Sequence, residues 1–570
     1  MIYKKLMTYK KLMIYKIFTT YKRATGLLAL CLLLMMVVTS CSSDKPTYLE
    51  PHLSTLAASD ITRTEATLNG IVKLEGETDM PQLTFRYGTT EAMSQTTKNL
   101  TTDNPTSDGT QVSLRLLNLT AGTTYYYMLQ GNNGRTTITS NIMSFTTQPN
   151  EKPTLGEAQI LSHGPMSVVV GYEITDNGGE AITETGCYYA LSSSASTTER
   201  NKVVLSNYQG EKGQQKVLIA HLNRNASYQI WPYAISRAGE AIGEPITFTT
   251  SDAISLHEAG VFSSLMGDNL YEYTSLTLSG PMNGDDLNCL RKMMGQNDDG
   301  TTTPGTLASI DMTEVKIVAG GGSYGSSRYT EDHIIGQGLF ANCTHLEKVS
   351  LPADATTLEK DAFTGCTSLQ EIEIPASIVN ILPSSGCTAL ERINVSGANT
   401  NYKSQDGVLL NENGTEIVWF PMGKKGEYTL PSTITAIGNY AFKECSIETF
   451  ILPDKLKEIG QGAFMDSRVK EVKLPANLQL IPTSTFQGCT QLKVVRIGKK
   501  TELISDYAFD LCPLTDLYVE ATYPPVCNPN AFSTRGTSFL NTCKVHVPTG
   551  RAGFYQSSNG WKNFSNILSD

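Results

Sequence analysis

Five residues near the end of the chain carry side chains suited to binding a ligand, and they recur at regular intervals. Lys473, Arg496 and Tyr518 are 23 and 22 residues apart, and Glu471 and Asp516 each stand two residues before a member of that series. Arg and Tyr are favoured as interface anchors because they combine a large contact area with directional hydrogen bonds. These residue types therefore indicate recognition of a partner. The alternative is that they only keep a solvent-facing sheet soluble.

Residues suited to catalysis or metal binding are scarce. The seven histidines are all more than four residues apart, and Asp285 and Asp286 are adjacent at the start of a predicted amphipathic helix, where carboxylates accept hydrogen bonds from free N–H groups. The segment from Asp176 to Glu180 is better explained as a tight turn than as a calcium loop. There is no Gly-x-Ser-x-Gly, His-Glu-x-x-His, P-loop or Cys-x-x-Cys motif. The sequence predicts no catalytic residue, no cofactor and no metal site.

The candidate binding residues belong to a repeated pattern, Leu-x-x-Ile-x-Leu and its apolar variants. Seven copies begin at Leu346, Leu369, Leu390, Ile447, Val469, Leu492 and Leu514. Most copies follow a phenylalanine. Phe363 lies 23 residues after Phe340, and successive phenylalanines from Phe442 to Phe509 are 22 or 23 residues apart. A constant period of this length is typical of a solenoid, in which each coil buries its apolar residues against its neighbours.

In this pattern the apolar residues point into the core and the intervening ones face solvent. Equivalent positions of successive coils should therefore stack into columns on one face of the solenoid. The first column is Ser350, Glu373, Asn394, Ile451, Lys473, Arg496 and Tyr518, and the second is Lys348, Glu371, Arg392, Thr449, Glu471, Val494 and Asp516. We expect the later coils, with Lys473, Arg496 and Tyr518, to form the ligand face.

Cysteines recur three residues after the phenylalanines, and in one copy Ser467 takes their place. Stacked side chains about 4.8 Å apart have poor geometry for a disulfide bridge, so these cysteines are expected to be small buried residues. Cys527 and Cys543 lie outside the array and are the only pair that we consider for a bridge.

The segments around the array are read as its caps and an insertion. Residues 252–335 keep a degenerate form of the pattern and are predicted to be the N-terminal cap, which a solenoid needs to cover its open end. The array itself is assigned to residues 336–520, with an insertion at 396–427 in which Asp406-Gly407 predicts a hairpin turn. Residues 521–570 are predicted to be the C-terminal cap.

Two similar modules precede the solenoid, at residues 51–149 and 153–250. Leu-x-x-x-Thr-x-Tyr ending at Tyr125 corresponds to Leu-x-x-x-Ala-x-Tyr ending at Tyr228, and both modules end on Phe-Thr-Thr. The motif resembles the tyrosine corner of fibronectin type III-like or immunoglobulin-like β-sandwiches, in which the phenol bonds back to the chain upstream. Two such sandwiches in series usually act as a stalk. The predicted fold is thus mainly β, with two sandwiches followed by a solenoid.

The first 40 residues read as a signal peptide. Seven Lys and Arg residues precede twelve mostly aliphatic residues, Leu27 to Val38, too few to span a hydrocarbon core of about 30 Å. The residues before Cys41 resemble a bacterial lipobox, which implies lipidation of Cys41; ordinary signal cleavage is the alternative. Residues 41–50 read as a tether, and Met1, Met7 and Met13 are all candidate starts.

Charge narrows the class of partner. Without residues 1–40, 38 Lys and Arg face 55 Asp and Glu, a formal charge of −17. Such a chain is a poor electrostatic partner for nucleic acid or an anionic membrane surface. Contact with a membrane is therefore expected only through the lipid anchor.

The repeats, fullest in Ala362-Phe363 to Pro375, resemble BspA-type leucine-rich repeats. The lipobox and the solenoid together predict a non-catalytic outer-membrane lipoprotein exposed on the cell surface. The resemblance to BspA-type repeats implies that it adheres to a host matrix protein or to another cell. The alternative function is a glycan-binding accessory of a nutrient-uptake system. Exposed aromatic pairs on the solenoid would favour that alternative, and the sequence suggests few.

Overall fold

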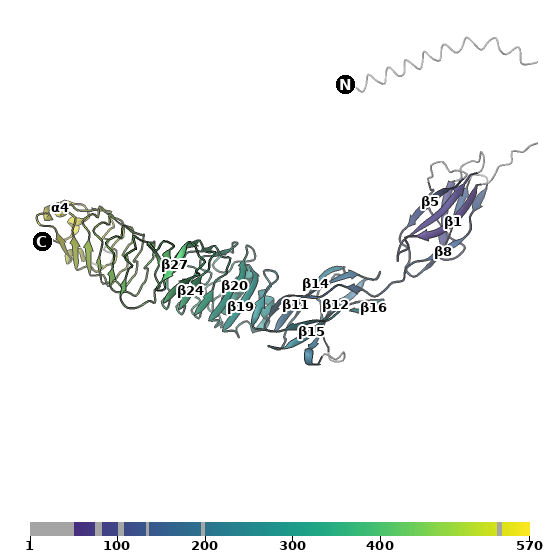
Figure 1. The fold of residues 1–570 in the computed structure, drawn as a ribbon, viewed down its shortest axis with the longest axis horizontal. Helices are drawn as coiled ribbons and strands as arrows, with labels where there is room; N and C mark the ends of the chain where they lie inside the picture. The colour runs from purple at the N-terminus through teal and green to yellow at the C-terminus, as the bar shows by residue number, and fades with distance from the viewer. Residues whose placement is uncertain (1–50, 75–81, 101–107, 133–135, 195–199, 533–538) are drawn as a thin grey trace, which may run out of the picture. The chain divides into compact units, whose positions relative to one another are not determined.

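The structure, a computed structural model, describes residues 51–74, 82–100, 108–132, 136–194, 200–532 and 539–570. The predicted signal peptide (1–40), Cys41 and the tether (41–50) lie outside the described residues. The chain divides into two compact units, residues 1–150 and 151–570 (Figure 1). Within the described part, no helix is both long and apolar enough to cross a membrane.

The first unit is a β-sandwich built from two antiparallel sheets. Its core consists of side chains that alternate along the strands, such as Leu68, Phe85 and Tyr127. One sheet has the order β1-β2-β5 and the other β4-β3-β6-β7, with β8 also paired to β6. The strands are β1 (His52–Ser59), β2 (Ala66–Lys73), β3 (Gln82–Gly88), β4 (Gln95–Thr96), β5 (Thr110–Leu116), β6 (Thr124–Asn132), β7 (Thr137–Thr139) and β8 (Met143–Thr146).

A second sandwich opens the other unit. Its strands are β9 (Thr154–Leu155), β10 (Gln159–Gly164), β11 (Ser167–Asp176), β12 (Ile182–Leu191), β13 (Asn201–Val204), β14 (Gly213–Ile219), β15 (Ser227–Ser236), β16 (Gly239–Ile242) and β17 (Ile246–Thr249), with a 3₁₀ helix η2 (Ser192–Ser194). Between β11 and β12 the chain reverses at Gly178 and Gly179, both with positive φ, as the turn interpretation predicts.

Both sandwiches contain the hydrogen bond expected of a tyrosine corner. The Tyr125 hydroxyl accepts from the N–H of Thr120 at 2.9 Å, and the Tyr228 hydroxyl accepts from the N–H of Asn223 at 2.8 Å. The last threonine of each Phe-Thr-Thr motif completes the corner, since its hydroxyl donates to the carbonyl of the same upstream residue. The Thr147 hydroxyl donates to the Thr120 carbonyl, and the Thr250 hydroxyl donates to the Asn223 carbonyl, both at 2.7 Å.

The second sandwich and the solenoid share one continuous sheet. The short strand β18 (Ala253–Ser255) pairs antiparallel with β10 of the sandwich, through His163 and Ser255, and parallel with β19 of the cap. A ten-stranded sheet thus runs in the order β14-β11-β10-β18-β19-β20-β22-β24-β26, with β9 paired to β11 (Figure 1). The sandwich therefore covers the N-terminal end of the solenoid by β-pairing.

The N-terminal cap contains two short helices and the first long parallel strands. Helix α3 begins after Asn283, whose side chain accepts from the N–H groups of Asp285 and Asp286, while Asp286 accepts from the N–H of Asn283. Asp286 therefore supports the helix start as the sequence predicts, but Asn283 is the N-cap. The elements are α2 (Phe262–Met266), η3 (Gly267–Asn269), β19 (Ser275–Met282), α3 (Gly284–Met293) and β20 (Ser309–Ile317).

The coils that follow carry two rows of parallel strands. The first row, formed by the Leu-x-x-Ile-x-Leu pattern, is β22 (Lys348–Ser350), β24 (Glu371–Ile374), β26 (Arg392–Val395), β30 (Tyr428–Thr429), β32 (Phe450–Ile451), β34 (Glu471–Lys473), β36 (Val494–Ile497) and β38 (Asp516–Val519). The second row is β21 (Ile334–Ile335), β23 (Thr357–Leu358), β25 (Asn380–Ile381), β29 (Glu416–Trp419), β31 (Ala436–Ile437), β33 (Glu458–Ile459), β35 (Leu480–Ile481), β37 (Leu503–Ile504) and β39 (Val526–Cys527).

A ladder of stacked phenylalanine rings runs through the coils. Phe442, Phe464, Phe486 and Phe509 stack in sequence with centroids 5.0 to 5.5 Å apart, and Phe532 continues the stack into the C-terminal segment. The recurring cysteines are buried and free, as predicted. Several donate to the phenylalanine carbonyl of the preceding coil, as Cys489 does to Phe464 at 3.0 Å.

The insertion and the C-terminal segment complete the solenoid. Asp406 and Gly407, both with positive φ, turn the chain between β27 (Tyr402–Gln405) and β28 (Val408–Asn411), which confirms the predicted hairpin. The C-terminal segment adds η4 (Phe539–Asn541), β40 (Lys544–Val547), α4 (Ala552–Ser557), η5 (Trp561–Asn563) and β41 (Asn566–Ser569). Strands β40 and β41 extend the first row in parallel.

Candidate ligand-binding face

The first row of strands aligns the residues of the predicted columns. Lys473 pairs with Arg496 and Arg496 with Tyr518 in the parallel register, and Glu471, Val494 and Asp516 are aligned beside them. In-register pairing places like positions on the same side of the sheet. The structure therefore brings Lys473, Arg496 and Tyr518 into one column, and Glu471 and Asp516 into the adjacent one.

Two more residues from the C-terminal segment extend these columns. Tyr518 pairs with His546, and Asp516 pairs with Lys544. This extension was not predicted, because residues 542–547 lack the leading leucine of the repeat. The signal was present in Val545-His546-Val547-Pro548, whose apolar positions have the phase of Val472-Lys473-Leu474-Pro475.

Arg496, Tyr518 and His546 form a stack across three strands. The guanidinium carbon of Arg496 lies 3.9 Å from the centroid of the Tyr518 ring, a cation–π contact. On its other side the Tyr518 ring stacks on the imidazole of His546, with centroids 4.3 Å apart and planes at 11°. These contacts hold all three side chains in defined positions before a ligand arrives, which lowers the entropy that binding would cost.

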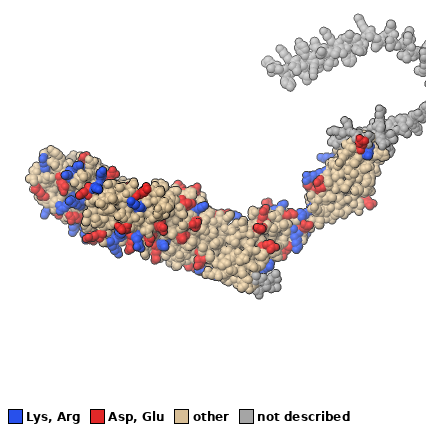
Figure 2. Space-filling model, viewed as in Figure 1, with Lys and Arg blue, Asp and Glu red and all other residues tan. Residues whose placement is uncertain are grey.

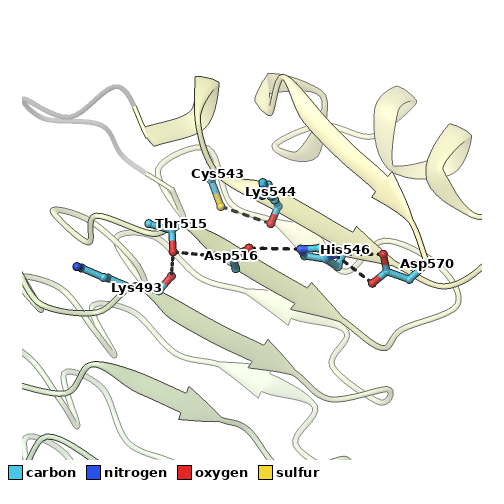
Figure 3. A network of polar contacts seen from close by, with 7 residues as sticks. All are labelled: Lys493, Thr515, Asp516, Cys543, Lys544, His546 and Asp570. Atoms are coloured by element: carbon cyan, nitrogen blue, oxygen red, sulfur yellow. Dashed lines mark hydrogen bonds and ion pairs between the residues drawn. The ribbon is translucent and has the colours of Figure 1, made fainter.

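Carboxylates hold both ends of this stack. Glu471 lies 3.5 Å from Nε of Arg496. The His546 ring lies between Asp516, 3.4 Å from Nε2, and Asp570, 3.1 Å from Nδ1, as Figure 3 shows. The Thr515 hydroxyl donates to Asp516 at 2.9 Å. The face thus presents fixed groups of both signs, and the visible side of the solenoid in Figure 2 likewise mixes basic and acidic side chains.

Lys473 borders a hollow of about 520 Å³ along the C-terminal ends of these strands. Its other lining residues include Pro453, Pro475 and Glu520. Ile451, the preceding member of the column, also lines the hollow and is 61% exposed. An exposed aliphatic side chain beside fixed charges is the mixture that a protein interface uses.

An aromatic pair on the C-terminal segment was also missed. Tyr523 and Phe554 meet edge to face with centroids 5.6 Å apart, and the guanidinium carbon of Arg551 lies 5.5 Å from each ring. Tyr523 is 64% exposed and Phe554 46%. The two residues are 31 positions apart, and only the course of the chain around the cap brings them together.

The bridge considered between Cys527 and Cys543 is not formed, and both thiols are free. Cys527 ends β39 in the second row of strands, whereas Cys543 precedes β40 in the first row, so the two side chains enter the core from different sheets. Burial raises the pKa of each thiol to about 12.

Residues able to bind a metal do not cluster in the described part of the chain, where no group of three or more His, Cys, Asp or Glu side chains is close enough to hold an ion. The face itself offers contact through charge, aromatic surface and hydrogen bonds.

Comparison with known proteins identifies the repeats. Residues 330–409 and 423–536 match, in six copies, the family described as the BspA type leucine rich repeat region. The match begins before the predicted array, runs beyond residue 520 and omits part of the predicted insertion. No curated protein matches the chain.

Solved structures resemble parts of the chain at low identity. The pneumococcal vaccine antigen PcpA is 17% identical, with 52% of this chain and 79% of that chain covered and a TM-score of 0.38. A leucine rich cell surface protein from Faecalibacterium prausnitzii A2-165 is 20% identical, with 60% and 97% covered and a TM-score of 0.35. A two-domain fibronectin type III segment of chicken tenascin is 17% identical, with 35% and 97% covered and a TM-score of 0.19.

Proposed function

We propose that the BspA-type repeats form the recognition surface of a non-catalytic bacterial cell-surface lipoprotein. Its partner is a protein, either a host matrix protein or a component of another cell, and its role is adhesion. The observation that carries this proposal is the Arg496–Tyr518–His546 stack, which is held at both ends by carboxylates and lies on the solvent side of the sheet.

The geometry of the face favours a protein partner. Fixed charges of both signs lie beside the exposed Ile451 and a hollow of about 520 Å³. A ligand with complementary charges and one apolar side chain would be bound both by the stack and by the hollow. Lys473 lies between the two and would contact both parts of such a ligand.

Anchoring through Cys41 is supported by the sequence alone. Lipidation there would attach the chain to the outer membrane, with residues 42–50 as a tether to the first sandwich. Metabolic labelling with a fatty-acid analogue tests this assignment. We expect label in the wild type and none in Cys41→Ser; equal label in both would leave the chain without this anchor.

The second candidate is glycan binding, which the Tyr523–Phe554 pair favours. Exposed aromatic rings bind the apolar faces of sugar rings, and Arg551 lies close enough to hydrogen-bond their hydroxyls. This pair is distinct from the Arg496–Tyr518–His546 stack, so substitutions can separate the two functions.

The deciding experiment is a binding screen of residues 46–570 against matrix proteins and polysaccharides. Residues 151–570 are screened beside it, because this piece contains the shared sheet and all the core clusters of the second unit. Saturable protein binding by both pieces supports adhesion through the solenoid. Binding to polysaccharide alone, or only when residues 51–150 are present, contradicts it.

Substitution then tests the face. Lys473→Ala, Arg496→Ala and Tyr518→Ala together should abolish protein binding without unfolding the chain. Lys348→Ala with Arg392→Ala, on earlier coils of the same row, serves as the matched control and should bind normally. Unchanged binding by the triple variant would remove this face from the proposal.

A further inference from the structure

A second hollow, of about 270 Å³, lies where the N-terminal cap meets the first coils of the solenoid. Its walls come from the end of α3, from residues 325–328 and from turns of the two coils that follow. The polar side chains at its walls include Arg291, Gln296, Arg328, Asn342, Asp361 and Thr364. None of them belongs to the ligand face described above.

Arg291 is buried at this hollow without a charged partner. It is 6% exposed, and its guanidinium donates only to carbonyls, those of Gly338 at 2.9 Å and Leu339 at 2.7 Å and, more weakly, Ala341 at 3.4 Å. Its Nε–H is buried and has no hydrogen-bond partner among the described residues. A buried arginine is normally paired with an anion, because removing its charge from water is costly.

Arg328 brings a second guanidinium to the same place. Its side chain forms no hydrogen bond or ion pair within the described part of the chain. A Cβ added at Gly338 would lie 2.7 Å from Nη1 of Arg328, while the Gly338 carbonyl accepts from Arg291. Gly338 therefore lies between the two guanidinium groups.

Glycine at position 325 lets the backbone pass close to the unpartnered Nε–H of Arg291. A Cβ at Gly325 would lie 3.2 Å from Nε of Arg291, and Gly325 has φ of +153°. Thr364 also lines the hollow, and its hydroxyl oxygen is buried without a hydrogen-bond partner in the described part of the chain. Arg291 and Thr364, which each have an unpartnered donor among the described residues, thus both line the hollow.

The charge of the walls selects the ligand. Two arginines oppose a single carboxylate, Asp361, so the walls carry a net charge of +1. A singly charged, planar carboxylate matches this net charge and the flat edge of a guanidinium. A doubly charged phosphate would be repelled more strongly by the Asp361 carboxylate. The volume is just below the range of about 300–1,000 Å³ typical for drug-sized ligands, which suits one small acid or one acidic sugar.

We propose that this hollow binds a carboxylate group, held by the guanidinium groups of Arg291 and Arg328, with Thr364 as an additional contact. The site is separate from the Arg496–Tyr518–His546 stack and does not depend on the function proposed for it. The carboxylate belongs either to a simple small acid or to a uronic acid.

Calorimetric titration at constant ionic strength tests the proposal on residues 46–570. The probes are acetate for the carboxylate alone, glucuronate for the carboxylate on a sugar ring, glucose for the ring alone, and phosphate. We expect saturable binding of acetate or glucuronate, and none of glucose. Equal affinities for both acids indicate a simple acid, and tighter binding of glucuronate indicates a uronic acid.

Arg328→Gln is the decisive variant, because it removes no hydrogen bond or ion pair formed within the described ranges and should leave the melting temperature unchanged. It should weaken carboxylate binding at least tenfold, and Thr364→Val should weaken it less. Arg392→Gln, on the strand face, is the matched control and should bind like the wild type. Absence of carboxylate binding, full binding by Arg328→Gln, or tighter binding of phosphate would overturn the proposal.

Discussion

The ring of Tyr518 stacks on the ring of His546, with centroids 4.3 Å apart and planes at 11°. Tyr518 belongs to the last strand of the predicted array and His546 to the C-terminal segment, so the stack joins the two surfaces. Through His546, the C-terminal segment contributes a side chain to the proposed ligand face as well as covering the end of the solenoid. The proposed ligand face therefore extends beyond the repeats that the sequence pattern delimits.

The first prediction concerns His546. His546→Ala should weaken binding of the partner found in the screen by roughly tenfold, because it removes the surface that fixes Tyr518. His333→Ala is the matched control, since His333 is a half-exposed histidine paired with Asp354 at 3.2 Å on a distant coil. Surface plasmon resonance measures both variants. Equal affinities for the two would show that the stack is not part of the interface.

The second prediction concerns the phenylalanine ladder. Phe464 is fully buried between Phe442 and Phe486, with centroids 5.0 and 5.2 Å away. Phe464→Ala should lower the free energy of unfolding by about 3–5 kcal/mol, because neighbouring coils cannot close the cavity. Phe554→Ala makes the same change on the surface and should cost about 1 kcal/mol or less. Urea unfolding followed by circular dichroism measures the free energy of unfolding of both variants. Equal losses for Phe464→Ala and Phe554→Ala would show that the position in the ladder does not matter.

The third prediction concerns the cysteines. All ten in the described residues are free, and burial raises the pKa of most of them, including Cys343 and Cys445, to about 12. The thiolate is the reactive form, so native residues 46–570 should not react with Ellman's reagent at pH 8. In denaturant, without reductant, ten thiols per chain should react. A count of eight would instead indicate a disulfide bridge.

The repeat period predicted which residues align into columns, because in a parallel solenoid residues at the same position of successive repeats pair with one another. Once Lys473, Arg496 and Tyr518 occupy the same position of the pattern, parallel pairing aligns them without further information. The same reasoning predicted which residues are buried, and the hairpin at Asp406-Gly407 followed from local turn chemistry alone.

Features that depend on contacts between dissimilar segments were not predictable in this way. Arg291 reaches the Gly338 carbonyl across 47 residues, from a helix to a turn of the first coils, and neither segment has a motif that indicates the contact. The pairing of β10 with β18 rests on a three-residue strand, too short for periodicity to identify. The sequence suggested boundaries near residues 150 and 251; the compact units divide at residue 150, and the second sandwich belongs to the same unit as the solenoid.

The fourth prediction concerns the joint between the second sandwich and the solenoid. Ser167 is buried, and its hydroxyl donates to the Leu265 carbonyl of α2 at 2.7 Å. Ser167→Ala should destabilise residues 151–570 by about 1–2 kcal/mol, since it leaves that carbonyl buried without its donor. The exposed Ser206→Ala should have no effect. Thermal unfolding measures both, and equal stability would mean that the joint does not couple the two parts.

Stability of the same joint should also depend on pH. His163 lies in β10, where burial lowers the pKa of its imidazole below the ordinary value, although a hydrogen bond to the backbone of Ala253 opposes this shift. Its ring packs on Phe248 with centroids 5.5 Å apart, and its Nδ1 is buried without a partner in the described residues. The unfolded chain therefore binds a proton at higher pH than the folded one does. This contribution to stability is complete above about pH 6.5, the ordinary histidine pKa, and is lost as the pH falls from there toward the lowered value in the fold.

His163→Gln removes the titrating group, so the free energy of unfolding of residues 151–570 should fall less steeply between pH 7.5 and 5.5 in this variant than in the wild type. Urea unfolding at the two pH values measures both slopes, and the other histidines contribute equally to each. Parallel slopes would show that His163 is as accessible to protons in the folded protein as in the unfolded chain.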